Sequence, residues 1–374
     1  MKKTALEKAI NAKTKKIKTE SFDLSFNEIL DMYNNKELII APDYQRMFRW
    51  SVEKQSMLIE SLILDMPLPP IFVIETEDGI YELIDGLQRI STYLHFRYDD
   101  IGCELKKELC NNIEEALELD GCDIIEELNG NTFSKLSDRY QRALKRHFIR
   151  IEVLKSETDR EIRYHMFKRL NTGGELLSDQ EVRDCTIRIL GDKFNNFIKQ
   201  CSKDENFINS IYPVQEEYAK TKKDQELVLR YFALRNNLKN YNKNLNGFLT
   251  GYMEEVTKDD GCFNYDKEED IFKSVFKYIN EMYGINAFSS LINEDKNKYR
   301  KDMVMYVFDS LTCGLAKHID EIDKKDKIKL KKELTELRRT KFANKTGGGK
   351  GNTKERIEMV EKVIKECPLI DRTE

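Results

Sequence analysis

The chain has 374 residues, of which 40% are hydrophobic and 35% charged, and its net charge is −4. This length exceeds what one hydrophobic core usually serves, so we expect at least two domains. The apolar content and small net charge exclude a disordered chain and favour a globular, helix-rich protein. The acidic balance argues against duplex binding as the main activity, because non-specific duplex binders present a dominant basic face.

Charge is spread unevenly along the chain. Residues 104–127 hold nine acids against two lysines, whereas residues 321–350 hold eleven Lys/Arg against five acids. A basic block attracts phosphate, but interleaved charges are also typical of a solvated helix face. We therefore keep two interpretations of residues 321–356, a DNA contact and a solvated face.

The eight cysteines include no CxxC pair and have no histidines at zinc-binding spacing. This spacing predicts no metal-binding residues, and scattered thiols are typical of a reducing cytosol. The sequence has no apolar leader and no apolar run of about eighteen residues. These features predict a cytoplasmic protein with no membrane partner.

Apolar periodicity and turn residues predict the elements in chain order. Residues 1–20 form a lysine-rich arm or lead-in helix. Helices and strands then alternate: helix 26–33, strand 38–40, helix 51–66, strands 71–74 and 80–84, a helix after residue 86, helix 133–147, strand 148–154 and helix 158–169. Beyond them we expect only helices, at 178–201, 224–239, 244–257, 266–283, 297–318, 321–341 and 353–366. This pattern predicts an α+β protein with a mixed α/β domain at 21–155 and an all-helical domain at 156–374.

The segment Asp85-Gly86-Leu87-Gln88-Arg89 links a strand to a helix. A glycine in such a turn lets a ligand approach the backbone, and the first helical turn offers unpaired N–H groups to a phosphate. Arg89 opposes the helix dipole there and needs an anion to compensate it. Ser91 and Thr92 add hydroxyl donors. The alternative is an ordinary turn with Asp85 as the helix cap.

Two further clusters have the chemistry of a nucleotide site. Residues 44–50 read YQRMFRW, in which Arg46 suits a bidentate phosphate contact and Tyr44 or Trp50 suits stacking on a base. Residues 168–174 read KRLNTGG, two cations beside a glycine turn. Each also has a purely structural interpretation, as a core tryptophan and as a helix stop.

Four motifs occur in order: YQRMFRW, PLPPI, IDGLQRIST and FKRLNTGGELLSDQEVR. Together they resemble the GmrSD-type restriction enzyme N-terminal domain family, which is also known for its DGQQR motif. The resemblance spans residues 44–183. It implies a ParB/sulfiredoxin-like fold, a role in prokaryotic defence against foreign DNA, and binding and hydrolysis of an NTP.

The resemblance also implies the site residues. Asp85, Gly86, Gln88 and Arg89 form its core, Arg46 joins from YQR, and Asn171 and Gly173 join from NTGG. Leu87 replaces the first glutamine of DGQQR, so we expect Leu87 to face the core.

We hypothesise that Asp85 or Gln88 orients water or Mg²⁺ while Arg46 and Arg89 offset phosphate charge. The sequence has no Walker A pattern. Three functions stay open: an NTP-binding and hydrolysing sensor, a DNA-binding module without turnover, and a ParB-like metal-dependent nuclease.

The small number of histidines in the C-terminal half argues against an HNH-type nuclease centre there. Long members of the family carry an HNH half, which needs a His-Asn-His site. The C-terminal half of this chain has one histidine, His318, so a His-Asn-His site cannot form there, and either DNA cleavage belongs to a partner subunit or this chain acts without it. His95, His147 and His165 are the other candidates for acid–base chemistry, although a histidine on an apolar helix is usually packed.

Overall fold

The chain divides into two compact units, residues 1–175 and 176–374, and each is described by itself. The computed structural model describes residues 4–14, 16–40, 50–76, 78–100, 115–159, 162–163, 165–166, 169, 178–241, 244–259, 261–289, 302–342 and 350–370. None of the helices in these ranges is long and apolar enough to cross a membrane.

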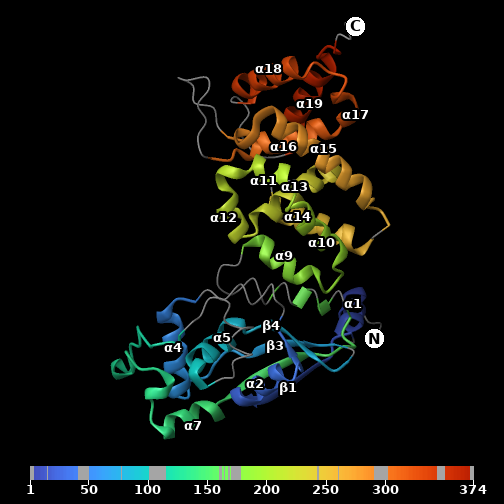
Figure 1. The fold of residues 1–374 in the computed structure, drawn as a ribbon. Helices are drawn as coiled ribbons and strands as arrows, with labels where there is room; N and C mark the ends of the chain where they lie inside the picture. Colours follow the sequence, from blue (N-terminus) through green and yellow to red (C-terminus); the bar gives the residue numbers. More distant parts are fainter. Residues whose placement is uncertain are drawn as a thin grey trace. The chain divides into compact units, whose positions relative to one another are not determined.

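The first unit is built on a five-stranded mixed sheet with the order β1–β5–β3–β4–β2 (Figure 1). Its strands are β1 (Thr19–Ser25), β2 (Leu38–Ile39), β3 (Ile71–Glu75), β4 (Tyr81–Asp85) and β5 (Phe148–Leu154). Its helices are α1 (Ala5–Thr14), α2 (Phe26–Asn34), α4 (Val52–Ile63), α5 (Leu87–Phe96) and α7 (Asp138–Arg146). The pairs β1–β5 and β3–β4 are antiparallel, whereas β3–β5 and β2–β4 are parallel.

Stacked aromatic rings connect two helices, α2 and α5, in the core of this unit. Phe26 of α2 stacks on Tyr93 of α5 with ring centroids 4.2 Å apart, and both side chains are buried. Aliphatic side chains of β3, β4 and β5 complete the core. The position of α5 is therefore fixed by packing along its length as well as by the turn that precedes it.

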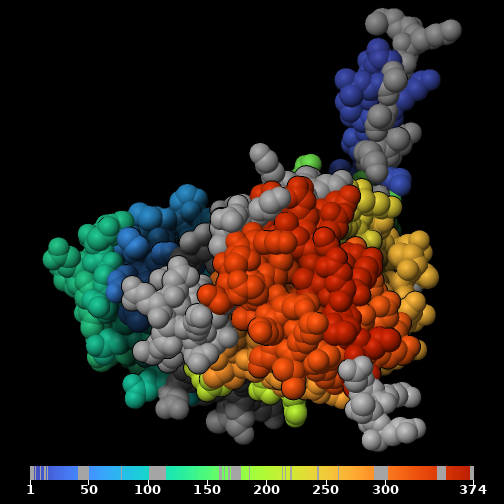
Figure 2. Space-filling model, turned by 90° about the horizontal axis from the view of Figure 1, so that it is seen from above, coloured from blue at the N-terminus to red at the C-terminus, as the bar shows by residue number. Residues whose placement is uncertain are grey.

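The second unit is helical in the part that the structure describes. Its helices are α9 (Asp179–Ile187), α10 (Lys193–Cys201), α11 (Glu205–Ser210), α12 (Gln215–Lys220), α13 (Lys223–Asn237), α14 (Leu245–Lys258), α15 (Tyr265–Tyr283), α16 (Met305–Ala316), α17 (Ile319–Ile322), α18 (Lys327–Leu337) and α19 (Lys350–Glu366). A π-helical turn, Arg338–Phe342, follows α18. Helix α13 is central to this unit, because every apolar side chain among its residues 227–234 is buried. Figure 2 shows α18 and α19, in orange and red, on one continuous surface.

The α+β prediction is confirmed. Ser178 and Glu181 form a capping box at the start of α9, since the Ser178 hydroxyl accepts from the Glu181 N–H and the Glu181 carboxylate accepts from the Ser178 N–H. Ser25 and Glu28 form a second capping box at the start of α2. These starts are local, so the sequence alone determines them.

Several element predictions were wrong. Residues 19–25 form the edge strand β1 instead of the end of an arm, because they pair with β5 along their whole length. Residues 178–201 form two helices separated around Gly191, and residues 133–147 form a 3₁₀ turn and α7. Helices α11 and α12 were not predicted.

The predicted domain boundary after residue 155 also lies before the boundary between the compact units. The Thr158 hydroxyl donates to the Lys18 carbonyl at 2.8 Å, and Lys16 pairs with Asp159. These contacts keep the chain beyond β5 in the first unit.

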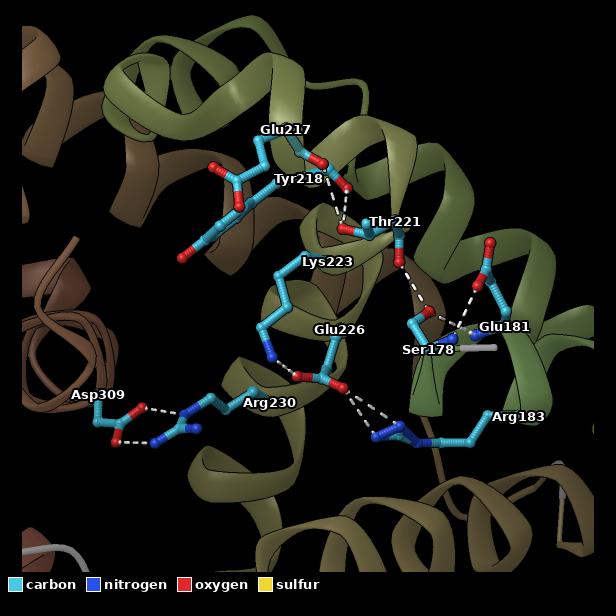
Figure 3. A network of polar contacts seen from close by, with 10 residues as sticks. All are labelled: Ser178, Glu181, Arg183, Glu217, Tyr218, Thr221, Lys223, Glu226, Arg230 and Asp309. Carbon is cyan, nitrogen blue, oxygen red and sulfur yellow. Dashed lines mark hydrogen bonds and ion pairs between the residues drawn. The ribbon is translucent and has the colours of Figure 1, made fainter. Parts of the chain in front are cut away.

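Buried ion pairs fix α9 within the second unit (Figure 3). Arg183 of α9 donates to Glu226 of α13 at 3.0 Å, and Lys223 reaches the same carboxylate. One turn further along α13, Arg230 makes two 2.6 Å bonds to Asp309 of α16. Arg183 and Glu226 are both buried, so the loss of Glu226 leaves the Arg183 guanidinium buried without this carboxylate, whereas the loss of Arg183 leaves Glu226 paired with Lys223.

We predict that Glu226→Leu, which leaves Arg183 buried without this carboxylate, lowers the free energy of unfolding by about 3–5 kcal/mol, and that Glu226→Leu with Arg183→Met recovers part of that loss. Chemical denaturation followed by circular dichroism measures both. The matched control is Arg150→Met, which breaks the exposed pair between Arg150 and Asp23 and should cost at most about 1 kcal/mol. Equal losses in the two single variants would contradict a structural role for the buried pair.

Candidate functional site

The turn between β4 and α5 is defined by one glycine. Gly86 has φ +112° and ψ 4°, a conformation that L side chains rarely adopt. A Cβ built on Gly86 would lie 2.8 Å from Cγ1 of Ile71 on β3. Glycine is therefore required by the backbone and by the neighbouring strand, whereas the sequence suggested ligand approach as the reason.

Asp85 and Arg89 form an ion pair across this turn. The Arg89 Nη2 lies 2.8 Å from Asp85 Oδ2 and donates to the Pro70 carbonyl at 3.0 Å. The Arg89 side chain is 12% exposed and that of Asp85 is 39% exposed. The predicted need for an anion beside Arg89 is thus met in part by the chain itself. Arg89 Nε is buried with no hydrogen-bond partner, so the guanidinium keeps an unused donor.

Gln88 and Trp50, two residues predicted from separate motifs, lie together. The Trp50 backbone N–H donates to Gln88 Oε1 at 3.3 Å. Leu87 is buried, which confirms that it faces the core. The end of the YQRMFRW motif and the DGLQR motif therefore meet at the first turn of α5.

Ser91 and Thr92 do not lie where a ligand could reach them. Ser91 is 6% exposed and Thr92 is fully buried, with its hydroxyl oxygen lacking a hydrogen-bond partner. Both occupy the side of α5 that packs into the first unit. The prediction that they donate to a phosphate was wrong, because hydroxyls in the core cannot contact a ligand at the turn. Tyr44, Arg46, Asn171 and Gly173 lie outside the described residues.

The site also includes a residue that sequence reasoning missed. Gln55 of α4 is 4% exposed, donates from Nε2 to the Trp50 carbonyl at 2.8 Å, and places Oε1 2.7 Å from His95 Nδ1. His95 Nε2 lies 3.2 Å from the Glu115 carbonyl. The sequence did contain a signal for Gln55. Buried apolar residues of α4 follow it at i+3, i+4 and i+7, which places this polar side chain on the apolar face of the helix.

The other histidines predicted as acid–base candidates lie beside carboxylates or are solvent-exposed. His147 lies 3.3 Å from Asp65, His318 lies beside Glu321, and His165 is exposed. Burial raises the pKa of the Cys201 thiol to about 12, which keeps it protonated. Within the described ranges, no group of three His, Cys, Asp or Glu residues is arranged to hold a metal ion.

The first unit is thus a mixed α+β domain with a charged strand–turn–helix site. Residues 26–188 match the GmrSD restriction endonuclease, N-terminal domain. This match indicates a component of a restriction or anti-phage system. Neither a curated protein nor a solved structure matches the chain. The matched segment ends one residue after α9, so it includes a helix of the second compact unit.

We predict that Gly86→Ala lowers the free energy of unfolding by roughly 2–5 kcal/mol, the sum of backbone strain and overlap with Ile71. Gly79→Ala is the control, because Gly79 also has a positive φ but a Cβ there meets nothing within 4 Å. That control should cost only about 1–2 kcal/mol. Thermal or urea unfolding compares them, and equal losses would show that contact with Ile71 contributes nothing.

His95 predicts a dependence of stability on pH. Burial lowers its pKa below the ordinary 6.5, and the Glu115 carbonyl offsets only part of this effect. Below about pH 6.5 the unfolded chain therefore binds a proton that the folded chain does not, so stability falls as the pH falls towards the folded pKa. We predict that His95→Gln makes the fall shallower by up to about 1.4 kcal/mol per pH unit. Urea midpoints between about pH 7.5 and 5 measure this, and identical slopes would contradict it.

Proposed function

We propose that this protein binds a nucleoside triphosphate with Mg²⁺ at the turn between β4 and α5, and acts as a regulatory or sensor component of a system against foreign DNA. The family domain supports the biological setting. The observation that carries the nucleotide proposal is Arg89, whose guanidinium is held at the start of α5 by the half-exposed Asp85 carboxylate and the Pro70 carbonyl. A guanidinium at a helix N-terminus, where the first backbone N–H groups have no partner within the helix, suits a phosphate.

Each proposed ligand contact follows from its position. Arg89 would bind phosphate oxygens, and the half-exposed Asp85 would orient water or the hydrated cation. Gln88 would contribute its amide from the same turn, with Gly86 keeping the approach free of a side chain. Bound Mg²⁺ would offset phosphate charge.

Further proposed contacts come from the sequence. The family resemblance implies Arg46, Asn171 and Gly173, and the aromatic side chain of Tyr44 or Trp50 would stack on the base. Ser91 and Thr92 take no part, because both are buried. The ParB/sulfiredoxin-like fold and hydrolysis of the bound NTP belong to the same proposal.

The test is a panel of ATP, GTP, CTP and UTP with MgCl₂, in which calorimetry gives affinity and phosphate release gives turnover. We expect Arg89→Ala to weaken the preferred nucleotide by about 10- to 100-fold, the worth of a lost charged hydrogen bond. Arg89→Lys should lose less, since it keeps the charge. The control is Arg150→Ala, which removes a more exposed arginine of β5. Well-folded wild-type protein that binds none of the four would overturn the proposal.

The same panel separates the two alternative functions. The hypothesis that residues 321–356 bind DNA is weakened, because Lys325, Arg338 and Arg356 are buried and their charges cannot reach a duplex. Salt-dependent duplex affinity without nucleotide binding would favour the DNA-binding module. DNA cleavage by homogeneous protein, lost in Asp85→Ala, would favour the nuclease. Each of these outcomes is compatible with a restriction-system component that has DNA or a defence subunit as its partner.

A further inference from the structure

A buried amide on α4 connects the two motifs of the site. Gln55 occupies a position of the α4 stripe that otherwise buries Leu58, Ile59 and Leu62. Burial of an amide is costly unless both its ends are hydrogen-bonded. Both ends of Gln55 have partners, and neither partner is on α4.

The peptide of Trp50 is held from two sides. Its N–H donates to Gln88 Oε1 at 3.3 Å, and its carbonyl accepts from Gln55 Nε2 at 2.8 Å. Gln88 lies on α5 and Gln55 on α4, so the two amides connect both helices to one backbone position. Trp50 is the last residue of the YQRMFRW motif, and its position fixes where that segment ends.

The Trp50 carbonyl determines the orientation of the Gln55 amide. A carbonyl oxygen only accepts, so the amide nitrogen must face it, and a flipped amide would place two acceptors against each other. Gln55 Oε1 then lies 2.7 Å from His95 Nδ1, which donates to it in the Nδ1–H tautomer. The amide therefore has one stable orientation.

We propose that Gln55 is a positioning residue that holds Trp50, and with it the end of the YQRMFRW segment, against the first turn of α5. Its geometric part stands on the distances above, and its effect on ligand affinity rests on the proposed nucleotide function. Gln55 acts through Trp50 and Gln88.

Intrinsic fluorescence tests the geometric part directly, because Trp50 is the only tryptophan of the chain. We expect Gln55→Leu, which removes both hydrogen bonds, to shift Trp50 emission and to raise its quenching by acrylamide. Gln55→Glu is the second variant. It keeps an acceptor for His95 but sets a carboxylate oxygen against the Trp50 carbonyl, and should act in the same direction.

Ser56→Ala is the matched control. Ser56 is the neighbouring residue on α4, is fully buried, and accepts the Asp120 N–H at 2.8 Å without contacting Trp50. It therefore loses one buried hydrogen bond elsewhere on the same helix. Circular dichroism establishes that each variant is folded before its fluorescence is compared with that of wild type.

Nucleotide affinity of the same three variants tests the functional part. We expect Gln55→Leu to weaken the nucleotide preferred by wild type by about tenfold, the worth of one hydrogen bond, and Ser56→Ala to leave it unchanged. Trp50 emission and quenching that stay at wild-type values in both Gln55 variants, or that change equally in Ser56→Ala, would overturn the inference. Selective exposure of Trp50 in a protein that binds no nucleotide would support the positioning role while the proposed function fails.

Discussion

The site depends on a reversal of the chain that leaves no room for a side chain. At Gly86 the strand β4 turns into α5 in a left-handed conformation, and Ile71 of the adjacent strand occupies the space where a Cβ would project. This contact fixes the turn against the sheet. The direction of α5 follows from it, and so do the positions of Asp85 and Arg89, which pair across the turn. Side chains one turn apart can be aligned in this way only when the backbone between them is fixed.

The second constraint is the anchoring of Trp50. The last peptide of the YQRMFRW motif, that of Trp50, is bonded to side-chain amides from two helices. Helix α4 anchors its surroundings in the same way elsewhere, since Glu60 accepts the backbone N–H groups of Ile124 and Ile125. Buried polar residues on an otherwise apolar helix face thus connect irregular segments whose backbone groups need partners.

The family domain and the compact units do not share a boundary. Residues 26–188 match the family, yet α9 folds within the second unit, where Arg183 is paired with Glu226 of α13. A buried ion pair contributes little net stability compared with apolar packing, but it strongly penalises separation of its partners. The matched domain is therefore tied to the helical unit by its own last helix.

The sequence by itself determined the elements whose signals are local. Serine caps, the β3–β4 pair and the glycine turn before α5 were predictable, because each depends on neighbouring residues. Tertiary structure decided what depends on distant partners: β1 becomes a strand only by pairing with β5, Thr92 is lost to the core, and Arg89 is compensated by Asp85. Gln55 was visible as a polar residue in an apolar stripe, but its role was not. The reason is physical, since propensity and periodicity act within one turn or strand, whereas burial and hydrogen-bond partners are set by chain segments that meet only in the fold.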